Sequence, residues 1–198
     1  RLGGIALPNP LRIAISSDQD RLFAGAVAAE MGVDERPSNW RTRVDAYRRT
    51  HLDRGEPDWQ EDPQVASLVD QYEGLLRRDG MIDFEDMVLI GLRLIESHRW
   101  IRRALRAKFP VLVIDEYQDL GVPIHRIVQS LCFRAGVRLF AVGDPDQSIY
   151  GFTGARPDLL RDLSRVRGVE TVQLQFNYRS GRTIIAASET ALGEARGY

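Results

Sequence analysis

The sequence predicts an α/β fold in which helices flank an open parallel β-sheet and a mainly helical part comes first. Short apolar runs, typical of buried parallel strands, occur at residues 111–114, 137–142 and 169–174, and a helix-like segment precedes each of them. Residues up to about 80 instead show helical periodicity and are rather polar. We therefore expect the sheet to lie in the second part of the chain.

The individual elements follow from periodicity and from helix start and stop signals. Ser16-Ser17-Asp18 is expected to cap the first helix, Gly32 to end it, and Asp83 to cap a later one. The expected elements are a strand at residues 11–15, helices at 16–31, 40–52, 63–78, 83–97 and 99–108, a loop at 54–57, and the three strands named above.

Composition limits the class of protein without identifying a partner. The chain has 198 residues, of which 43% are hydrophobic, enough for the core of one domain that carries a smaller lobe. No apolar run approaches the roughly 20 residues that cross a bilayer, and residues 1–4 lack a signal-peptide pattern, so we expect a cytoplasmic protein without membrane contact. The net charge of −1 indicates no general affinity for nucleic acid, and Cys132, the single cysteine, allows no internal disulfide.

Lysine use excludes one kind of nucleotide site from these 198 residues. Lys108 is the only lysine, and it lies between Ala107 and Phe109. A phosphate-binding loop of the form G-x-x-x-x-G-K-[ST] needs a lysine between Gly and Ser or Thr. That loop is absent from this sequence, and we expect the isolated chain not to hydrolyse ATP.

The strongest local signal is an apolar strand that ends in two acids, Asp115 and Glu116. Open α/β sheets bind ligands at the carboxyl ends of their strands, and adjacent acids there can divide the work. Asp115 can hold Mg²⁺, which prefers oxygen ligands and phosphates, while Glu116 can orient and deprotonate an attacking water. Taken alone, the same acids could also belong to a solvated turn or helix start.

Three sequence motifs in a fixed order favour the catalytic interpretation of these acids over the solvated turn. Asp115-Glu116-Tyr117-Gln118-Asp119 resembles motif II (D-E-x-Q-D) of the UvrD/Rep-type, PcrA-like superfamily 1 DNA helicases. Residues 142–155 (VGDPDQSIYGFTGA) resemble motif III of that family, and residues 174–180 (LQFNYRS) resemble motif IV. With less specificity, residues 81–87 (MIDFEDM) resemble the segment where such chains re-enter the first RecA-like domain. The resemblance implies a RecA-like α/β fold of the P-loop NTPase type, here without the P-loop.

Motif III carries candidate contacts to ATP and to DNA. Gln147 can hydrogen-bond the γ-phosphate and the catalytic water, and the resemblance implies that it links the ATP site to DNA. Tyr150 and Phe152 lie two apart, so on an extended segment their rings would face the same way and could stack on successive unpaired bases. Core packing is the other interpretation of these rings. Relatives often have Trp in place of Phe152 and Arg in place of Thr153, so one charged contact of the relatives is not expected here.

Motif IV and a basic segment add further candidates. The resemblance implies that Arg179 presents a charged fork to the γ-phosphate and that Tyr178 stacks on the adenine, although Arg179 could instead form a surface salt bridge. The basic residues between Arg93 and Lys108 could bind phosphates. A charge run on a helix is usually a solvated surface, and this is the interpretation that we favour.

The resemblance also implies a division of the chain and a function. Residues 1–80 would belong to a helical inserted lobe, and residues 81–198 would form the later part of the first RecA-like motor domain, with motifs II, III and IV. The intact enzyme would be an ATP-dependent 3′-to-5′ DNA helicase or translocase that uses ATP and Mg²⁺. Its partners would be single-stranded DNA and duplex junctions, and the remainder of the polypeptide would supply the P-loop segment and a second RecA-like domain.

Two other functions are compatible with part of this pattern. A non-catalytic, truncated relative that binds single-stranded DNA or a partner protein would share the motifs and is the alternative function. A different Walker-type ATPase, such as a kinase, would explain the strand-end acids but not motifs III and IV. The coding sequence on either side of this segment distinguishes the helicase motor from the non-catalytic relative. A motor requires a Gly-rich loop upstream and a second α/β domain downstream.

Overall fold

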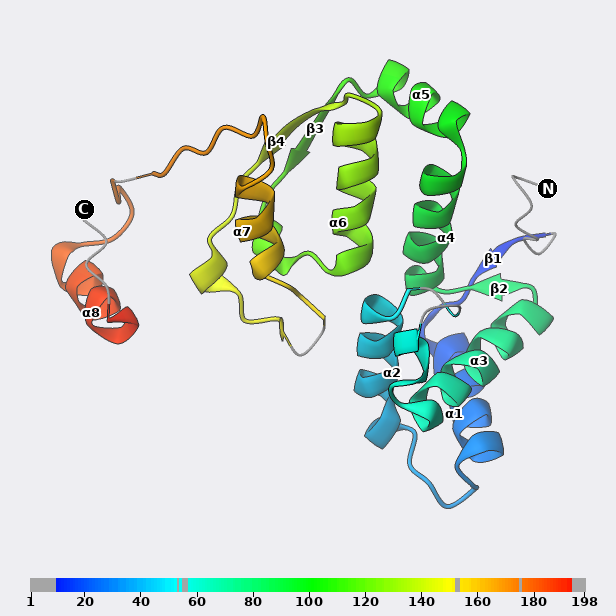
Figure 1. The fold of residues 1–198 in the computed structure, drawn as a ribbon. Helices are drawn as coiled ribbons and strands as arrows, with labels where there is room; N and C mark the ends of the chain where they lie inside the picture. Colours follow the sequence, from blue (N-terminus) through cyan, green and yellow to red (C-terminus); the bar gives the residue numbers. More distant parts are fainter. Residues whose placement is uncertain (1–9, 53, 55–56, 152–153, 175, 194–198) are drawn as a thin grey trace. The chain divides into compact units, whose positions relative to one another are not determined.

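The computed structural model describes residues 10–193 apart from 53, 55–56, 152–153 and 175 (Figure 1). The chain divides into two compact units, Arg1–Asp162 and Leu163–Tyr198. Within the described residues, no helix is both long and apolar enough to cross a bilayer.

The α-helices are α1 (Ser16–Glu30), α2 (Ser38–Thr50), α3 (Pro63–Arg78), α4 (Phe84–Ser97), α5 (Arg99–Lys108), α6 (Val122–Gln129), α7 (Asp158–Ser164) and α8 (Arg182–Leu192). The strands are β1 (Arg12–Ile13), β2 (Met81–Ile82), β3 (Val111–Ile114) and β4 (Arg138–Ala141). Short 3-10 helices are η1 (Pro57–Gln60), η2 (Tyr117–Asp119) and η4 (Pro145–Gln147), and the π-helical turn η3 (Ser130–Arg134) extends α6.

Helix α3 organises the core of the helical part, where it contacts both α1 and α2 (Figure 1). Asp62 caps it by accepting a hydrogen bond from the Val65 amide at 3.2 Å, and Pro63 occupies the first turn, where it removes no helical hydrogen bond. Its buried apolar side chains recur at helical spacing: Val65, Leu68, Val69, Tyr72 and Leu76. Burying each such side chain stabilises the fold by roughly 1.5–3 kcal/mol. The sequence-based bounds of this helix are confirmed.

Strands β1 and β2 close the helical part by bringing its two ends together. They pair in parallel, with Arg12 opposite Met81 and Ile13 opposite Ile82. The Ala14 amide continues the ladder by donating to the Ile82 carbonyl at 2.9 Å. The strand expected at residues 11–15 therefore exists but is shorter, and its partner comes from the far end of the three-helix segment.

Helix α1 begins without the predicted cap. Ile15 is its N-cap residue and makes no side-chain capping hydrogen bond, while Ser16, Ser17 and Asp18 already lie in the first turn. The prediction that these three residues cap the helix was wrong. An N-cap residue needs an extended backbone, and Ile15 is the extended one (φ −84°, ψ 171°) because it follows directly on the β1 segment.

A fully buried arginine, Arg48, joins α2 to the start of α4. Its guanidinium donates to Asp83 at 2.7 and 3.1 Å, to Glu73 at 3.2 Å and to Asp86 at 2.9 Å. Asp83 also caps α4 by accepting from the Asp86 amide at 2.8 Å, within a capping box. The predicted cap is confirmed, and the same carboxylate anchors α2.

The carboxylates of Asp83, Asp86 and Glu73 all approach the Arg48 guanidinium, and Glu73 also pairs with Arg54 and Arg77. Burial, together with the neighbouring Asp83 and Glu73 carboxylates, outweighs Arg48 and raises the pKa of Asp86 to about 6. For Asp83 burial acts in the same direction, but the paired hydrogen bonds from Arg48 prevail and lower its pKa. Since the pKa of Asp86 is raised on folding, its contribution to stability is complete below about pH 4 and is lost as the pH rises through about 6.

The second two-stranded sheet holds the predicted pair of apolar runs. Strands β3 and β4 are parallel, as expected, and Val113 lies opposite Phe140. These two side chains are 66% and 61% exposed. Because alternate side chains of a strand point to opposite faces, the described residues cover only one face of this sheet. The expectation that residues 111–114 form a buried strand is wrong for the described part of the chain, because Val111 and Val113 are exposed.

The third predicted strand, at residues 169–174, does not form. This segment lies in the second unit, where Val172 and Leu174 are exposed. A strand requires a neighbour for its hydrogen bonds, and this segment pairs with no other strand among the described residues. Its apolar pattern alone therefore gave a wrong assignment.

Candidate functional site

Two loops meet at the carboxyl edge of the β3–β4 sheet. The Val142 amide donates to the Ile114 carbonyl at 2.8 Å, and the Tyr117 amide donates to the Val142 carbonyl at 2.9 Å. Residues 115–119, which follow β3, therefore lie beside residues 142–147, which follow β4. This edge of an open parallel sheet is where such folds bind ligands.

Glu116 has a strained backbone at this edge. It adopts the left-handed conformation (φ 51°, ψ 47°), and among the described residues it is the only non-glycine with a positive φ. Such a conformation costs on the order of 1–3 kcal/mol and persists mainly at functional sites. Its amide donates to the Asp115 carboxylate at 3.0 Å, and both acidic side chains are exposed. The structure thus presents two adjacent carboxylates to solvent at the end of β3.

Gln118 is the buried residue that connects the two loops. Its side-chain nitrogen donates to the Glu116 carboxylate at 2.6 Å, and its side-chain oxygen accepts from the Asp144 amide at 3.0 Å. The backbone carbonyl of Gln118 accepts from the Ser148 hydroxyl at 3.5 Å. A side chain that is only 2% exposed therefore ties motif II residues to motif III residues.

Gly143 makes this contact possible because it has no side chain. A Cβ atom at this position would lie 2.6 Å from Oε1 of Gln118 and 3.0 Å from both the Tyr117 amide nitrogen and a methyl group of Leu160. Distances this short are not tolerated in packed proteins. Position 143 therefore requires glycine for the two loops to approach each other.

Tyr117 fixes the motif II loop to helix α6. It is fully buried, and its hydroxyl lies 2.8 Å from Nδ1 of His125. Burial raises the pKa of Tyr117 to about 12 and lowers the pKa of His125. At neutral pH this is therefore a hydrogen bond between two uncharged groups.

Gln147 lies on the neighbouring loop, in the turn η4, as expected from the sequence. Its side-chain nitrogen donates to the Asp144 carboxylate at 2.9 Å, and the other oxygen of Asp144 accepts from the Asp146 amide at 3.0 Å. The structure thus brings three predicted site residues, Asp115, Glu116 and Gln147, to one edge of the sheet.

Two backbone hydrogen bonds join the described residues on either side of positions 152–153. The Tyr150 carbonyl accepts from the Ala155 amide at 3.3 Å, and the Gly151 carbonyl accepts from the Gly154 amide at 3.0 Å. The expected extended segment from Tyr150 to Phe152 falls partly outside the described residues and stays a prediction. The Tyr150 ring is 48% exposed, and Phe152 lies outside the described residues.

The predicted motif IV residues lie in the second unit. Asn177 shapes a turn there by accepting hydrogen bonds from the Arg179 amide at 3.0 Å and the Ser180 amide at 2.9 Å. The Tyr178 side chain is 93% exposed, and its ring centre lies 6.2 Å from that of Phe176. The proximity of Tyr178 and Arg179 to Glu116 stays a prediction.

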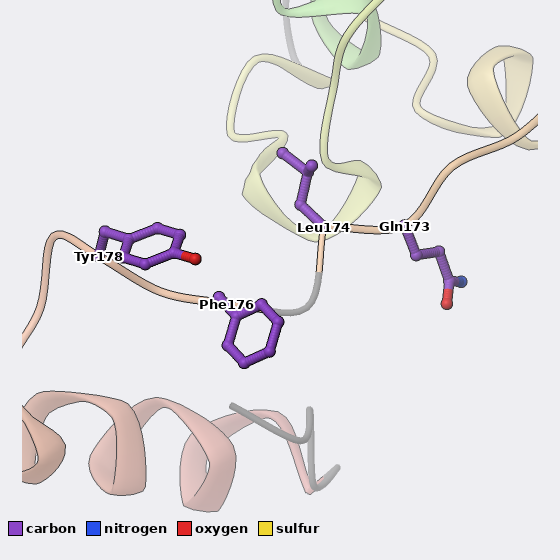
Figure 2. Close-up of a pocket in the computed structure, with 4 residues that line it drawn as sticks. All are labelled: Gln173, Leu174, Phe176 and Tyr178. Carbon is purple, nitrogen blue, oxygen red and sulfur yellow. The ribbon is translucent and has the colours of Figure 1, made fainter.

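The second unit contains a shallow hollow of its own. It has a volume of about 340 Å³ and is lined by Gln173, Leu174, Phe176 and Tyr178 (Figure 2). Gln173 points away from the two aromatic rings in this view. The lining residues carry no formal charge that could balance a phosphate, so we assign this hollow no ligand.

Comparison with known proteins identifies the family. Residues 8–166 match the family described as the UvrD/REP helicase N-terminal domain, which covers most of the chain. The chain belongs to the UvrD/Rep helicase family. Membership assigns it to the RecA-like α/β fold of that family, with which the parallel β3–β4 pair agrees.

Relatives within the UvrD/Rep family are named ATP-dependent DNA helicases. The chain is 32% identical over 191 residues to UvrD2 of Mycobacterium tuberculosis, a match that covers 94% of this chain and 26% of the relative. It is 34% identical over 118 residues to Rep of Escherichia coli, covering 59% of this chain and 17% of Rep. It is 33% identical over 129 residues to PcrA of Leuconostoc citreum, covering 65% and 17% of the two chains. The chain thus spans about a quarter, or less, of the length of these UvrD/Rep relatives.

Sequence reasoning missed the contacts that hold this UvrD/Rep site together. Gln118 is the glutamine of the D-E-x-Q-D motif, so the sequence marked it as a candidate site residue. Its partner Asp144 is 26 residues away, so the sequence did not indicate this contact. The need for glycine at position 143 and the bond from Tyr117 to His125 also depend on which elements are neighbours in space. These contacts therefore required the structure.

The basic helix α5 has mainly structural contacts among those described. Arg102 donates to the carbonyls of Ile95 and Glu96 at the end of α4, the latter at 2.8 Å. Arg106 lies against Gly136, where an added Cβ would be 3.4 Å from the guanidinium. These contacts favour the interpretation of α5 as a solvated helix and do not favour its interpretation as a phosphate-binding surface.

Proposed function

We propose that this chain is part of the motor domain of an ATP-dependent DNA helicase or translocase. One observation carries the proposal: Glu116, in a strained backbone conformation, projects a carboxylate beside Asp115 at the open end of a parallel sheet. This is the arrangement that a water-activating base next to a metal-binding acid requires. The proposal also includes the direction of movement on DNA, from 3′ to 5′, which rests on the resemblance to the family.

In this proposal Glu116 accepts a proton from the water that attacks the γ-phosphorus of ATP, and Gln147 orients that water and the γ-phosphate. Both side chains are exposed at the sheet edge, where a nucleotide can reach them. The motif IV residues complete the roles, with Arg179 contacting the γ-phosphate and Tyr178 stacking on the adenine.

Asp115 would hold Mg²⁺ together with the nucleotide. Its carboxylate is exposed at the end of β3, and no group of three potential metal ligands exists among the described residues. This donor set suits Mg²⁺, which proteins commonly bind through one or two carboxylates plus substrate phosphates and water. When bound, the ion would offset the negative charge of the phosphates.

The proposal also assigns the two parts of the chain. Residues 1–80 would form part of an inserted helical lobe that faces duplex junctions, and residues 81–198 the later part of the first RecA-like domain. The P-loop segment and the second RecA-like domain would come from the remainder of the same polypeptide. Arg48 supports a firm attachment of the lobe, because it binds the start of α4 through buried charges.

The direct test is steady-state ATP hydrolysis by the full-length protein with and without a dT oligonucleotide. We expect DNA-stimulated turnover, and unwinding of a duplex with a 3′ tail in preference to one with a 5′ tail. DNA binding without any turnover would instead identify a non-catalytic single-stranded DNA binding module.

Tyr150→Ala in the full-length protein should weaken binding of single-stranded DNA by about 1–3 kcal/mol, with little dependence on base sequence, because a base loses its stacking ring. A stacking ring neutralises no phosphate, so the slope of log affinity against log salt should stay close to that of the unchanged protein. Fluorescence-anisotropy titrations with dT and mixed-sequence oligonucleotides measure both quantities. Phe152→Ala should behave in the same way.

Thermal melts provide the control for this prediction. Truncating a core ring costs about 3–5 kcal/mol of folding stability, whereas truncating a half-exposed ring should barely change the melting temperature. Unchanged DNA affinity combined with a large drop in melting temperature would contradict the stacking role and would show that these rings pack in the core.

A further inference from the structure

A continuous series of hydrogen bonds connects Gln147 to Glu116. The Gln147 side chain donates to the Asp144 carboxylate at 2.9 Å, the Asp144 amide donates to the Gln118 side chain at 3.0 Å, and Gln118 donates to Glu116 at 2.6 Å. Both ends of this series are residues to which the proposed function gives chemical roles. Gln118 itself has no role in that proposal.

The chemistry of the partners fixes the orientation of the Gln118 amide. An ionised carboxylate only accepts hydrogen bonds, so the Gln118 nitrogen must face Glu116. A backbone amide only donates, so the Gln118 oxygen must face Asp144. A shorter, apolar or reversed side chain at this position could not make both bonds.

Gln118 is also held in place sterically. It is buried, and its amide oxygen lies so close to the backbone of Gly143 that a methyl group added to this glycine would be 2.6 Å from it. The loop after β4 and the carboxylate of Glu116 thus both contact one buried amide.

We propose that Gln118 is a positioning residue that couples the orientation of the Glu116 carboxylate to the loop that carries Gln147 and Tyr150. The inference rests on the proposed function, because it assumes that Glu116 activates the water. Contact of DNA with the loop then changes the position of Asp144, and Gln118 passes this change to Glu116. DNA stimulation of ATP hydrolysis thus depends on an amide that touches neither DNA nor nucleotide.

The test uses steady-state ATPase kinetics of the full-length enzyme with and without a dT oligonucleotide. Gln118→Met keeps the length of the side chain and removes both hydrogen bonds. We expect kcat with DNA to fall roughly 10- to 100-fold, as for a catalytic group displaced by about 1 Å. The KM for ATP should change by less than about threefold, since nucleotide binding is unaffected. The ratio of DNA-stimulated to basal turnover should fall toward one.

Gly143→Ala perturbs the same contact from the other side while leaving Gln118 in the chain. It should reproduce the loss of kcat and of DNA stimulation, and its effect should be smaller in a Gln118→Ala background than in the unchanged enzyme, because the closest contact of the added methyl group is with Gln118. Thermal melts of each variant show whether the fold is kept. A melting temperature close to that of the unchanged enzyme, together with lost stimulation, supports positioning.

Two outcomes overturn the inference. One is a folded Gln118→Met or Gly143→Ala enzyme with unchanged kcat and unchanged DNA stimulation. The other is a loss of activity that follows the loss of folded protein in both variants. Glu116→Gln in the same assay separates this inference from the proposed function: if Glu116→Gln is inactive while Gln118→Met is normal, only the positioning role fails.

Discussion

In the full-length enzyme, Glu116→Gln should lower DNA-stimulated ATP turnover by at least about a hundredfold while leaving nucleotide binding nearly unchanged. General-base catalysis contributes about 10²–10⁴-fold, and an amide of the same size cannot accept the proton. Because Gln keeps the shape of the side chain and Asp115 is untouched, the nucleotide site itself should persist. Steady-state turnover with a dT oligonucleotide and titration with a fluorescent ATP analogue measure the two quantities.

Glu61→Gln is a matched control for this substitution. The Glu61 side chain is largely exposed in the helical part, and its contact among those described is a hydrogen bond to His51. The same chemical change there should leave turnover unaffected. If the Glu116→Gln enzyme retained more than about a tenth of normal turnover, Glu116 could not be the general base.

Arg48→Met should produce the largest loss of folding stability, about 3–5 kcal/mol. Methionine fills a similar volume, but it leaves Asp83 and Asp86 without the guanidinium that binds them in the protein interior. Removing one partner of a buried ion pair is costly because the remaining charge is neither solvated nor paired. Urea unfolding of the chain, followed by circular dichroism, measures this loss.

The matched control is Arg43→Met on the same helix. Arg43 pairs with Asp62 at 2.7 Å, but its side chain is half exposed. An exposed pair contributes about 0–1 kcal/mol, so this variant should unfold close to the unchanged chain. Equal effects of the two substitutions would contradict the role given to the buried cluster.

Local signals in the sequence predicted much of the fold. The bounds of α3, α5 and β3 were predicted correctly, because a cap, an apolar run or a change of periodicity marks each end. The strand at residues 169–174 was predicted wrongly, because an apolar run becomes a strand only beside a partner. The Ser16-Ser17-Asp18 cap failed for a related reason, since the preceding strand fixed the extended residue at Ile15.

The candidate site was predictable in its residue types but not in its connections. Strand order placed Asp115, Glu116 and Gln147 at one edge, and the structure brings these three together. Arg48 had no distinguishing feature in the sequence, because it stands in an arginine-rich stretch that resembles a solvated helix. Its importance comes from carboxylates 25 to 38 residues away. The roles of Tyr150, Phe152, Tyr178 and Arg179 stay predictions.

Asp83 both caps helix α4 and pairs with Arg48, and these two contacts together affect how the first turn of α4 can unwind. Helix ends usually fray, because their terminal amides have no partner within the helix. Here the first turn cannot unwind unless Asp83 releases both the Asp86 amide and the Arg48 guanidinium. Releasing Arg48 also frees α2 from Glu73 on α3. The amide protons of Asp86 and Met87, which both donate to Asp83, are therefore expected among the slow-exchanging ones, since they open together with the packing of three helices.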